Sequence, residues 1–524
     1  MSSSSVSRSF VLGLDGVPWN LLSQWANDGH LPNVSRIMNE GAQGPLQSTL
    51  PPTTAIAWPS IATGVRADKH GIYAFQNLTS SYGRTINTSR TIREPPIWEL
   101  LSPSIVANVP MTYPASEIDG TMITGMMTAT RESGFTHPPE FAETIEQEVP
   151  EYEIGLAWHD YHGRESAFLD DLSELVRARR KLMHLLMERE DWTLFFFVYT
   201  APDRLQHLIW DTDVILDHYR ELDEVLGDVI DYVADRDANL FVLSDHGFGP
   251  VSETMHLNAF LAREGYLQRK ENAGTRGAFD RLGINKQRVS SLLSRAGLED
   301  ILIKLLPDRL LDDIASSIPG EHGMYDVDFS ETYAFAYSGN LVYVNDALRF
   351  DDGVIAPAAR DGVKKEVKAT LEMTRHPETG EPFLDVYDGS KLFPTDPKAP
   401  DLVVVGPPGT DIHSSLSPEV FTPATERAAS HRQTGIFLAM GPNIATTTIT
   451  DATVYDLLPT LLHGIDRPIP RDGDGKILDI YEPDSPPATR RPRTEAYRRG
   501  STVDSVSENF DDVEDRLRGL GYIE

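Results

Sequence analysis

The chain has 524 residues, which is enough for a large core and for more than one domain. Its 79 acidic and 47 basic residues give a net charge of −32 at pH 7, which argues against the basic face of a nucleic-acid scaffold. The sequence contains no cysteine, so it forms neither a disulfide framework nor a thiolate metal site.

The acidic residues are spread along the whole chain, and lysine is scarcer than arginine. This composition predicts an acidic surface adapted to high salt, as in the cytoplasm of a halophilic archaeon. The N-terminus passes from a Ser-rich tail into a strand without a separate apolar signal segment, and no apolar run reaches the roughly 20 residues of a membrane span. We therefore expect a soluble, cytoplasmic protein without a membrane span; the sequence carries no signal for its oligomeric state.

Strands and helices alternate through the first half of the chain. The apolar patterns predict strands at residues 9–14, 104–114, 194–200 and 239–247, and helices at residues 17–28, 31–42, 95–101, 168–190 and 213–234. The segment 117–162 is rich in Gly, Pro and acidic residues, and we expect it to form loops over the active-site edge. Strands that alternate with helices in this way predict an α/β fold with a mostly parallel sheet.

The stretch TLPPTTAIAWPSIATGVRADKHGI at residues 49–72 combines hydroxyl groups, prolines and turn residues with a helix-like apolar pattern. That combination suits a nucleophile at the start of a helix, where free N–H groups and the helix dipole favour an anion such as a phosphoryl group. On its own, a Thr-rich loop is ordinarily a helix cap or a turn.

Four groups of Asp and His stand at or near predicted buried strands. They are Asp15, the pair Asp203 and His207, the pair Asp245 and His246, and His431. A lone Asp after a strand is usually a helix cap and a lone His is usually structural. Six such ligands together with a hydroxyl favour a site for two metal ions, because carboxylates and imidazoles bind borderline divalent cations and parallel sheets place their sites at the carboxyl ends of strands.

The second half of the chain is less regular. Residues 268–317 predict a helical insertion, followed by strands at 332–339, 341–346 and 401–408, a helix at 361–373, a closing strand at 435–442 and a final core helix at 451–465. We expect a first core part at residues 1–255, a cap at 256–400 that partly returns to the core, a second core part at 401–480, and a linker with a docked helix at 481–524.

Several motifs resemble the alkaline phosphatase superfamily, in its type I phosphodiesterase and nucleotide pyrophosphatase branch. They are GLDGVPWNLL, STLPPTTAIAWPSIATG, KHGIYAF, PPIWELL, SDHGFG, HRQTGIFLAMGP and LRGLGYI, and they cover most of the chain. In amino-acid sequence, these motifs are most similar to the predicted phosphohydrolase or phosphomutase family of that superfamily. The resemblance implies a three-layer α/β sandwich with helices on both faces of the sheet and an inserted cap.

The resemblance also implies roles for single residues. One ion would be held by Asp15, Thr54, Asp245 and His246, and the other by Asp203, His207 and His431. Zinc suits this ligand set, and manganese is the alternative. Thr54 falls at the nucleophile position of the family and would form a phospho-threonine intermediate. Asn77 would lie near the phosphoryl group, with a turn-forming Asn as the other interpretation.

Candidates for substrate contact lie outside this ligand set. His159 and His162 are interpreted as pocket or surface residues, since the ligand set is complete without them. His256 and His322 are candidates for contact between the cap and a substrate. Arg66 and Arg432 would supply a basic group for a phosphomonoester dianion.

The leading functional hypothesis is a hydrolase that cleaves phosphodiester or nucleotide-type pyrophosphate bonds in a small-molecule substrate. The Thr nucleophile and the absence of an obvious third basic group for a monoester dianion favour it, although Arg66 and Arg432 weaken the second argument. A phosphomutase or a phosphoryl or head-group transferase is the alternative, in which the cap excludes water and holds an acceptor. A metal-binding protein without activity is the third hypothesis, and the complete ligand set argues against it.

Overall fold

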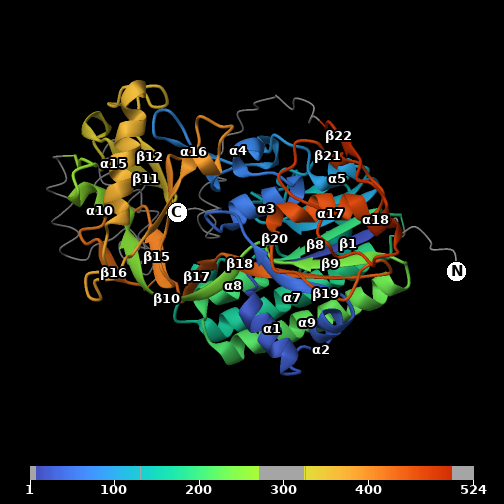
Figure 1. The fold of residues 1–524 in the computed structure, drawn as a ribbon. Helices are drawn as coiled ribbons and strands as arrows, with labels where there is room; N and C mark the ends of the chain where they lie inside the picture. Colours follow the sequence, from blue (N-terminus) through green and yellow to red (C-terminus); the bar gives the residue numbers. More distant parts are fainter. Residues whose placement is uncertain are drawn as a thin grey trace.

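The computed structural model describes residues 8–129, 131–189, 191–270, 324, 326–425 and 427–497. These residues form a core with a ten-stranded sheet and a smaller lobe with a four-stranded sheet (Figure 1). None of the described helices combines the length and the apolarity that a membrane span requires.

The core sheet has the strand order β19-β2-β18-β9-β1-β8-β5-β6-β7, and β20 also pairs with β2. The strands are β1 (Ser9–Leu14), β2 (Ala42–Gln47), β5 (Ser104–Val109), β6 (Gly120–Thr124), β7 (Thr136–His137), β8 (Leu194–Tyr199), β9 (Asn239–Leu243), β18 (Thr434–Met440), β19 (Thr447–Thr448) and β20 (Ala452–Thr453). Only β18, against β9 and β2, and β7, against β6, run antiparallel to a neighbour among these described strands. The central strands are mostly apolar, as expected for strands that are buried on both faces.

Helices cover both faces of this sheet (Figure 1). One layer holds α1 (Trp19–Asn27), α2 (Pro32–Glu40), α6 (Phe141–Glu148), α7 (Glu165–Met187) and α9 (Thr212–Ala234), and the other holds α3 (Thr54–Thr63), α5 (Ile97–Leu100) and α17 (Leu457–Gly464). Alternate residues of β1 enter different layers: Phe10 and Leu12 pack in the first and Val11 in the second. The predicted three-layer sandwich is thus confirmed.

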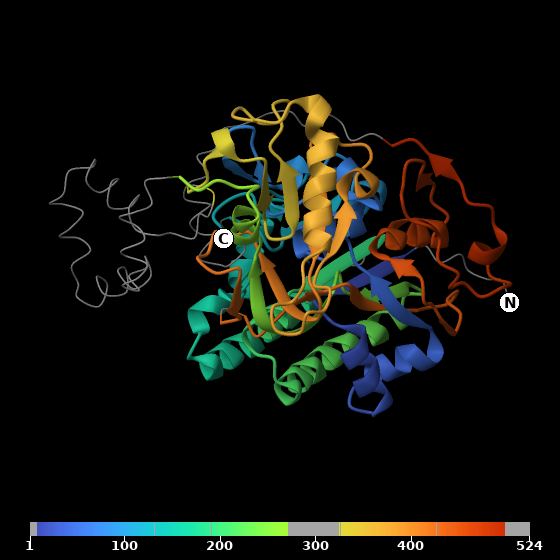
Figure 2. The same cartoon turned by 60° about the vertical axis from the view of Figure 1, so that its left-hand side comes forward.

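The smaller lobe, which we call the cap, is built on the strand order β11-β12-β14-β13. Helices α10 and α15 pack on this sheet in one apolar cluster, and Figure 2 shows α15 lying across it. The elements are α10 (Leu257–Arg263), β11 (Ala334–Tyr337), β12 (Leu341–Val344), α15 (Arg360–Glu372), β13 (Asp385–Asp388), α16 (Gly389–Leu392) and β14 (Leu402–Val405).

The long strand β10 (Gly247–His256) connects the core to the cap. At its core end β10 pairs with β17 (Ala429–Arg432), and at its far end with β15 (Gly409–His413) and β16 (Phe421–Pro423). Shorter elements on the core are α4 (Ala67–His70), β3 (Gln76–Leu78), β4 (Arg84–Ile86), α8 (Ala201–Leu208), β21 (Ile469–Pro470), α18 (Pro486–Thr489) and β22 (Thr494–Glu495).

Three expectations from the sequence differ from this fold. The expected linker that begins at residue 481 supplies α18 and β22, and β22 pairs with β21. The sequence predicts loops for the segment 117–162, but this segment supplies β6, β7 and α6 to the core. The strand β6 is short, begins with Gly120 and is followed by Gly125, so its apolar run does not stand out in the sequence. The expected boundary between residues 400 and 401 divides the cap sheet, because β14 pairs with β12 and β13.

Three expectations fall outside the described residues. They concern residues 271–317 of the expected helical insertion, the candidate His322, and the expected docked helix at the C-terminus.

Candidate metal centre

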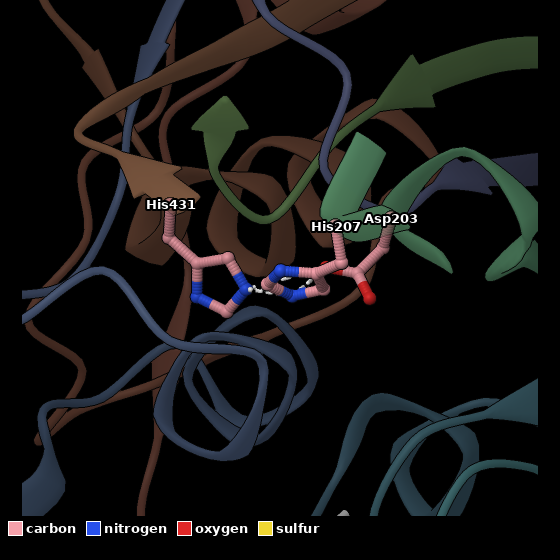
Figure 3. A group of neighbouring side chains, drawn as sticks. All are labelled: Asp203, His207 and His431. Carbon is pink, nitrogen blue, oxygen red and sulfur yellow. Dashed lines mark hydrogen bonds and ion pairs between the residues drawn. The ribbon is translucent and has the colours of Figure 1, made fainter. Parts of the chain in front are cut away.

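Three side chains from two distant segments meet beyond the carboxyl end of β8. Helix α8 begins directly after β8, with a proline in its first turn, so Asp203 and His207 lie one helical turn apart on the same side. His431 reaches them from β17 (Figure 3). Asp203 Oδ1 lies 3.5 Å from His207 Nε2 and 3.3 Å from His431 Nε2, and the two Nε2 atoms are 3.1 Å apart. We call this group triad A.

A second group, triad B, forms at the carboxyl ends of the neighbouring strands β1 and β9. Asp15 follows β1, and Asp245 and His246 follow β9, so parallel pairing brings them together. His246 Nε2 lies 3.7 Å from Asp15 Oδ1 and 3.3 Å from Asp245 Oδ2. In each triad the potential ligand atoms lie within 4.8 Å of one another.

Thr54 and the two triads form one continuous site. The imidazole rings of His246 and His431 stack with centroids 3.8 Å apart and an interplanar angle of 24°. Thr54 is the first residue of α3, is buried, and places Oγ1 3.1 Å from His246 Nε2. The Thr53 side chain does not cap this helix, while the Ile56 and Ala57 N–H groups donate to the Thr53 carbonyl at 3.1 and 2.9 Å. The positive end of the helix dipole therefore lies at Thr54.

Backbone carbonyls orient all three histidines. The Nδ1 atoms lie 3.1 to 3.2 Å from carbonyl oxygens, His207 from that of Ala429, His246 from that of Gly247 and His431 from that of Pro52. A carbonyl oxygen can only accept, so each Nδ1 carries the hydrogen and each Nε2 keeps a lone pair. All three Nε2 atoms face the carboxylates, which is how metal-ligating histidines are held.

Asp15 and Asp245 each have one carboxylate oxygen that accepts a hydrogen bond and one that does not. Trp58 Nε1 donates to Asp15 Oδ2 at 3.0 Å, and the Gly16 N–H donates to Asp245 Oδ1 at 3.2 Å. The buried atoms Asp15 Oδ1, Asp203 Oδ1 and Asp245 Oδ2 have no hydrogen-bond partner. These are the same oxygens that lie nearest the histidine Nε2 atoms, and a buried oxygen without a partner is unfavourable unless a cation binds it.

The electrostatics of the site favour cations. Burial, with the charges of Asp245 and Asp203, raises the pKa of Asp15 well above its ordinary value. Burial and the charge of Asp203 raise the pKa of Asp245 to about 8. Burial also opposes ionisation of Asp203, but His207 and His431 outweigh it and hold its pKa well below the ordinary value. Burial lowers the pKa of His246 to about 4 and keeps the ring neutral. Neutral imidazoles and crowded carboxylates fit divalent cations such as Zn²⁺ or Mn²⁺.

His159 lies at the edge of triad A. It belongs to the short 3-10 helix η2 (Trp158–Tyr161). The Trp158 ring stacks on the His207 ring with the centroids 5.1 Å apart. The same ring meets His159 and His162 edge to face, at centroid distances of 4.3 and 5.9 Å. Burial and the charges of Arg204 and Arg427 lower the pKa of His159 to about 4. The structure thus brings this predicted substrate residue next to the metal ligands.

Arg432, Arg66 and His256 are engaged with other parts of the protein. Arg432 follows His431 and donates to the carbonyls of His431 and Pro250, at 3.0 and 2.9 Å. The Arg66 guanidinium lies 3.4 Å from Asp474 and 3.7 Å from Asp68. The His256 ring lies between the hydroxyls of Ser415, at 2.5 Å, and Thr422, at 2.9 Å, in the sheet that connects core and cap.

Asn77 does not contact either triad within the described residues. It lies in β3 rather than in a turn, and its side-chain amide pairs with that of Asn87. Asn77 Nδ2 donates to Asn87 Oδ1 at 2.5 Å and Asn87 Nδ2 donates back at 3.2 Å. This pair closes the hairpin of β3 and β4.

Three side chains near the ligands were not selected from the sequence. Trp58 holds Asp15, Gln206 joins α8 to Gly16, and Arg427 lies beside triad A. Only Trp58 carries a signal that sequence inspection can use, because it follows Thr54 by one helical turn. The other two depend on contacts between distant segments.

A mostly parallel α/β core with two adjacent Asp/His triads and a buried hydroxyl defines a class, the metal-dependent phosphoester hydrolases. The chain belongs to the type I phosphodiesterase / nucleotide pyrophosphatase family, whose model matches residues 10–436. The resemblance seen in the sequence motifs is thereby confirmed, and with it the assignment as an enzyme acting on phosphoric esters.

Solved structures share the fold at low sequence identity. Murine ectonucleotide pyrophosphatase / phosphodiesterase 5 is 15% identical, with a TM-score of 0.50 over 89% of this chain and 97% of that chain. Phosphonoacetate hydrolase from Sinorhizobium meliloti 1021, in complex with phosphonoformate, is 13% identical, with a TM-score of 0.55 over 88% of this chain and 95% of that chain. A sequence comparison with curated proteins found no match.

Proposed function

We propose that this enzyme hydrolyses phosphodiester or nucleotide-type pyrophosphate bonds through a phospho-threonine intermediate, with two divalent metal ions. The observation that carries the proposal is the position of Thr54. Its hydroxyl is buried at the start of α3 and lies 3.1 Å from the Nε2 atom of His246 in triad B. A hydroxyl in this position offers a nucleophile that an adjacent base or a bound metal ion can activate.

The ligand sets follow from the two triads. Asp203, His207 and His431 would hold one ion, and Asp15, Asp245 and His246 would hold the other, with Thr54 beside it. Such ions supply positive charge that neutralises the phosphoester and lowers the pKa of the Thr54 hydroxyl. Zinc is the metal we propose first and manganese second, because the ligands are imidazoles and carboxylates without sulfur.

The chain's own groups account for the remaining steps. The positive N-terminal end of α3, which begins at Thr54, would attract and orient a phosphoryl oxygen. The Thr54 hydroxyl gives up its proton to solvent, a bond forms between Oγ1 and phosphorus, and the bond to the leaving oxygen breaks. The leaving group departs with the electron pair. Water then cleaves the phospho-threonine and regenerates the hydroxyl.

The test compares Thr54→Ala with the matched variant Thr53→Ala in metal-loaded protein. Thr53 is the adjacent half-buried threonine and makes no side-chain cap, so its loss should leave turnover within about threefold. Loss of the nucleophile should lower turnover of bis(4-nitrophenyl) phosphate by at least roughly 1,000-fold. Trapped phospho-protein in Thr54→Ser, found by mass spectrometry, would give a second readout.

Two other outcomes would change the proposal. Equal activity of Thr54→Ala and the parent protein would exclude Thr54 as the nucleophile. Protein that binds two metals yet cleaves neither a diester nor a pyrophosphate would point to phosphoryl transfer to an acceptor other than water.

We also propose that the enzyme works at high salt. The support is its net charge of −32, which needs screening by cations. Full activity without added salt in the same assay would contradict this proposal.

A further inference from the structure

A hollow of about 470 Å³ lies where the core meets the strands that lead to the cap. It is lined by the start of α1, the first half of β10, the turn into β15, and the residues where β17 passes into β18. Its volume falls within the range of roughly 300–1,000 Å³ that small-molecule sites in proteins have. Neither Thr54 nor any member of the two triads lines it, so the hollow is separate from the metal centre.

The lining of the hollow combines one cation with apolar side chains. Among the described residues that line it, Arg432 has the one charged side chain, and there is no carboxylate. The apolar part of the wall consists of Phe248, Pro18, Pro250 and Pro408. This charge is opposite in sign to that of the whole chain, whose net charge is −32.

Two backbone carbonyls hold the Arg432 guanidinium in place. Its Nη1 donates to the His431 carbonyl at 3.0 Å, and its Nη2 donates to the Pro250 carbonyl at 2.9 Å. The side chain can lie across β10 because residue 249 is glycine; a Cβ atom there would lie 3.0 Å from Arg432 Nε. A guanidinium has five N–H groups, so these two bonds leave three of them for another acceptor.

No carboxylate among the described residues lies within ion-pair distance of Arg432. Asp411 is on β15 beside the hollow, but its ion pairs are with His413 at 3.1 Å and with Arg427 at 3.8 Å. Its other oxygen accepts from Ser430 Oγ at 3.1 Å. A partly buried guanidinium that no carboxylate offsets favours an anion from solution.

The strand β17 stands between this hollow and triad A. Successive residues of a strand point to opposite faces, so Arg432 lies on the face away from the one on which His431 joins triad A (Figure 3). Phe248 pairs with His431 across the two strands, and its ring centroid lies 4.8 Å from that of His207 and 5.2 Å from that of His431. Phe248 therefore borders both the hollow and triad A.

We propose that this hollow binds a small organic anion, with the anionic group on Arg432 and an apolar body against Phe248 and the prolines. A fixed guanidinium with unused N–H groups binds an oxyanion through charge-assisted hydrogen bonds. The apolar wall favours a hydrocarbon or aromatic body, because burying it removes apolar surface from water. A bare inorganic anion would leave most of the hollow to water.

The competing explanation is that Arg432 only connects β17 to β10 through the carbonyls of His431 and Pro250. A structural arginine of this kind predicts no preference for an anionic ligand. A charge introduced into the hollow at a residue outside this connection separates the two explanations. Asn20 is such a residue, because it is exposed in the first turn of α1 and lines the hollow.

The experiment measures binding of 2-naphthalenesulfonate and of the neutral 2-naphthalenemethanol to metal-loaded protein by calorimetry at constant salt. Asn20→Glu adds a negative charge to the hollow, and Asn20→Gln is the matched control of equal length without the charge. Arg432→Gln removes the guanidinium charge. A titration with saturating methylphosphonate, whose phosphoryl group occupies the metal centre, tests whether the sulfonate binds at the triads instead.

We expect the parent protein to bind the sulfonate at least about 10-fold more tightly than the neutral compound. Arg432→Gln should weaken sulfonate binding by roughly 10- to 100-fold, because a charge-assisted contact is lost. Asn20→Glu should weaken it by at least about fivefold through repulsion, and Asn20→Gln should stay within about twofold of the parent protein. Methylphosphonate should leave the affinity unchanged.

Equal affinities for the two naphthalene compounds, no binding of either, or displacement of the sulfonate by methylphosphonate would overturn the proposal. A loss in Arg432→Gln without a loss in Asn20→Glu would assign the effect to the connection between β17 and β10, and would overturn it as well. Because only binding is measured, a failure of the proposed hydrolysis leaves this test unaffected.

Discussion

At the scale of single residues, Trp58 shows how a side chain without ionisable groups prepares a metal ligand. Its indole N–H donates to Asp15 Oδ2 and leaves Oδ1 directed at His246. The ring can approach β1 only because residue 13 is glycine; a Cβ atom at Gly13 would lie 2.4 Å from the indole. Gly13 thus makes room for the Trp58 indole, and the indole orients the Asp15 carboxylate.

We predict that Trp58→Phe weakens metal binding at triad B by roughly 10-fold, because outer-shell partners of metal ligands typically contribute that much. Trp98→Phe is the control, since the Trp98 ring also packs on Phe196 but its indole nitrogen has no hydrogen-bond partner. Affinity for zinc, measured by competition with a chelator, should fall only in the Trp58 variant. A similar fall in both variants would assign the effect to packing.

The sequence reveals a candidate residue most easily when its residue type is a common metal ligand. Asp and His after apolar runs are visible, so all six members of the triads were selected and the structure brings them together. Arg427 and Gln206 were not selected, because their position depends on how β17 and α8 approach the core. The roles of Arg66 and His256 in substrate contact were suggested by residue type alone, and the structure shows both engaged elsewhere.

At the scale of elements, α8 connects the two triads. Its Gln206, fully buried, donates to the Gly16 carbonyl at 2.9 Å, directly after Asp15. The same amide donates to Pro202 at 3.0 Å and accepts from Tyr219 of α9 at 3.3 Å. The helix that carries Asp203 and His207 is therefore fixed relative to the turn that carries Asp15.

We predict that Gln206→Met, which keeps the side-chain length, lowers the free energy of unfolding by about 1–3 kcal/mol, because the buried Gly16 carbonyl loses its donor. The zinc affinities of the two metal sites should also become unequal, because the turn that carries Asp15 and the helix α8 can then move independently. Urea unfolding and a zinc titration measure the two effects. Tyr219→Phe removes only the bond on the far side of Gln206, so it should retain the metal titration of the parent protein.

Elements with strong apolar runs, such as β1, β8 and β9, were predictable because a strand buried on both faces requires such runs. The strand β6 was missed because its apolar part is only a few residues long and its register is set by pairing with β5. The same limit applies to the cap boundary, where β14 follows a Pro-rich turn yet completes the sheet of β12 and β13.

At the scale of the whole molecule, the buried charges of the site couple metal binding to stability. The fold brings Asp15, Asp203 and Asp245 together from three different segments, and the two carboxylates with raised pKa prefer to keep a proton. Without cations, ionising them in the folded state is unfavourable. The metal ions and the fold should therefore stabilise each other most at a pH where these carboxylates are ionised.

The direction in which the stability of the metal-free protein changes with pH follows from Asp245. Its pKa is about 8 in the folded state against an ordinary value of 3.8, so its contribution to stability is complete below pH about 4 and is lost as the pH rises through about 8. His207, His246 and His431 have lowered pKa values and act in the opposite direction, but only below their ordinary pKa of 6.5. The window from pH 6.5 to 8 therefore isolates the carboxylates.

We predict that metal-free protein loses about 2 kcal/mol of unfolding free energy between pH 6.5 and 8, at roughly 1.4 kcal/mol per pH unit. Saturating zinc should remove most of this slope, because the cations offset the charge that appears. Asp245→Asn, whose amide does not titrate, should flatten the slope without metal. Urea unfolding at constant high salt measures all three, and a metal-free stability that is level or rises across the window would show that cations do not offset a buried charge here.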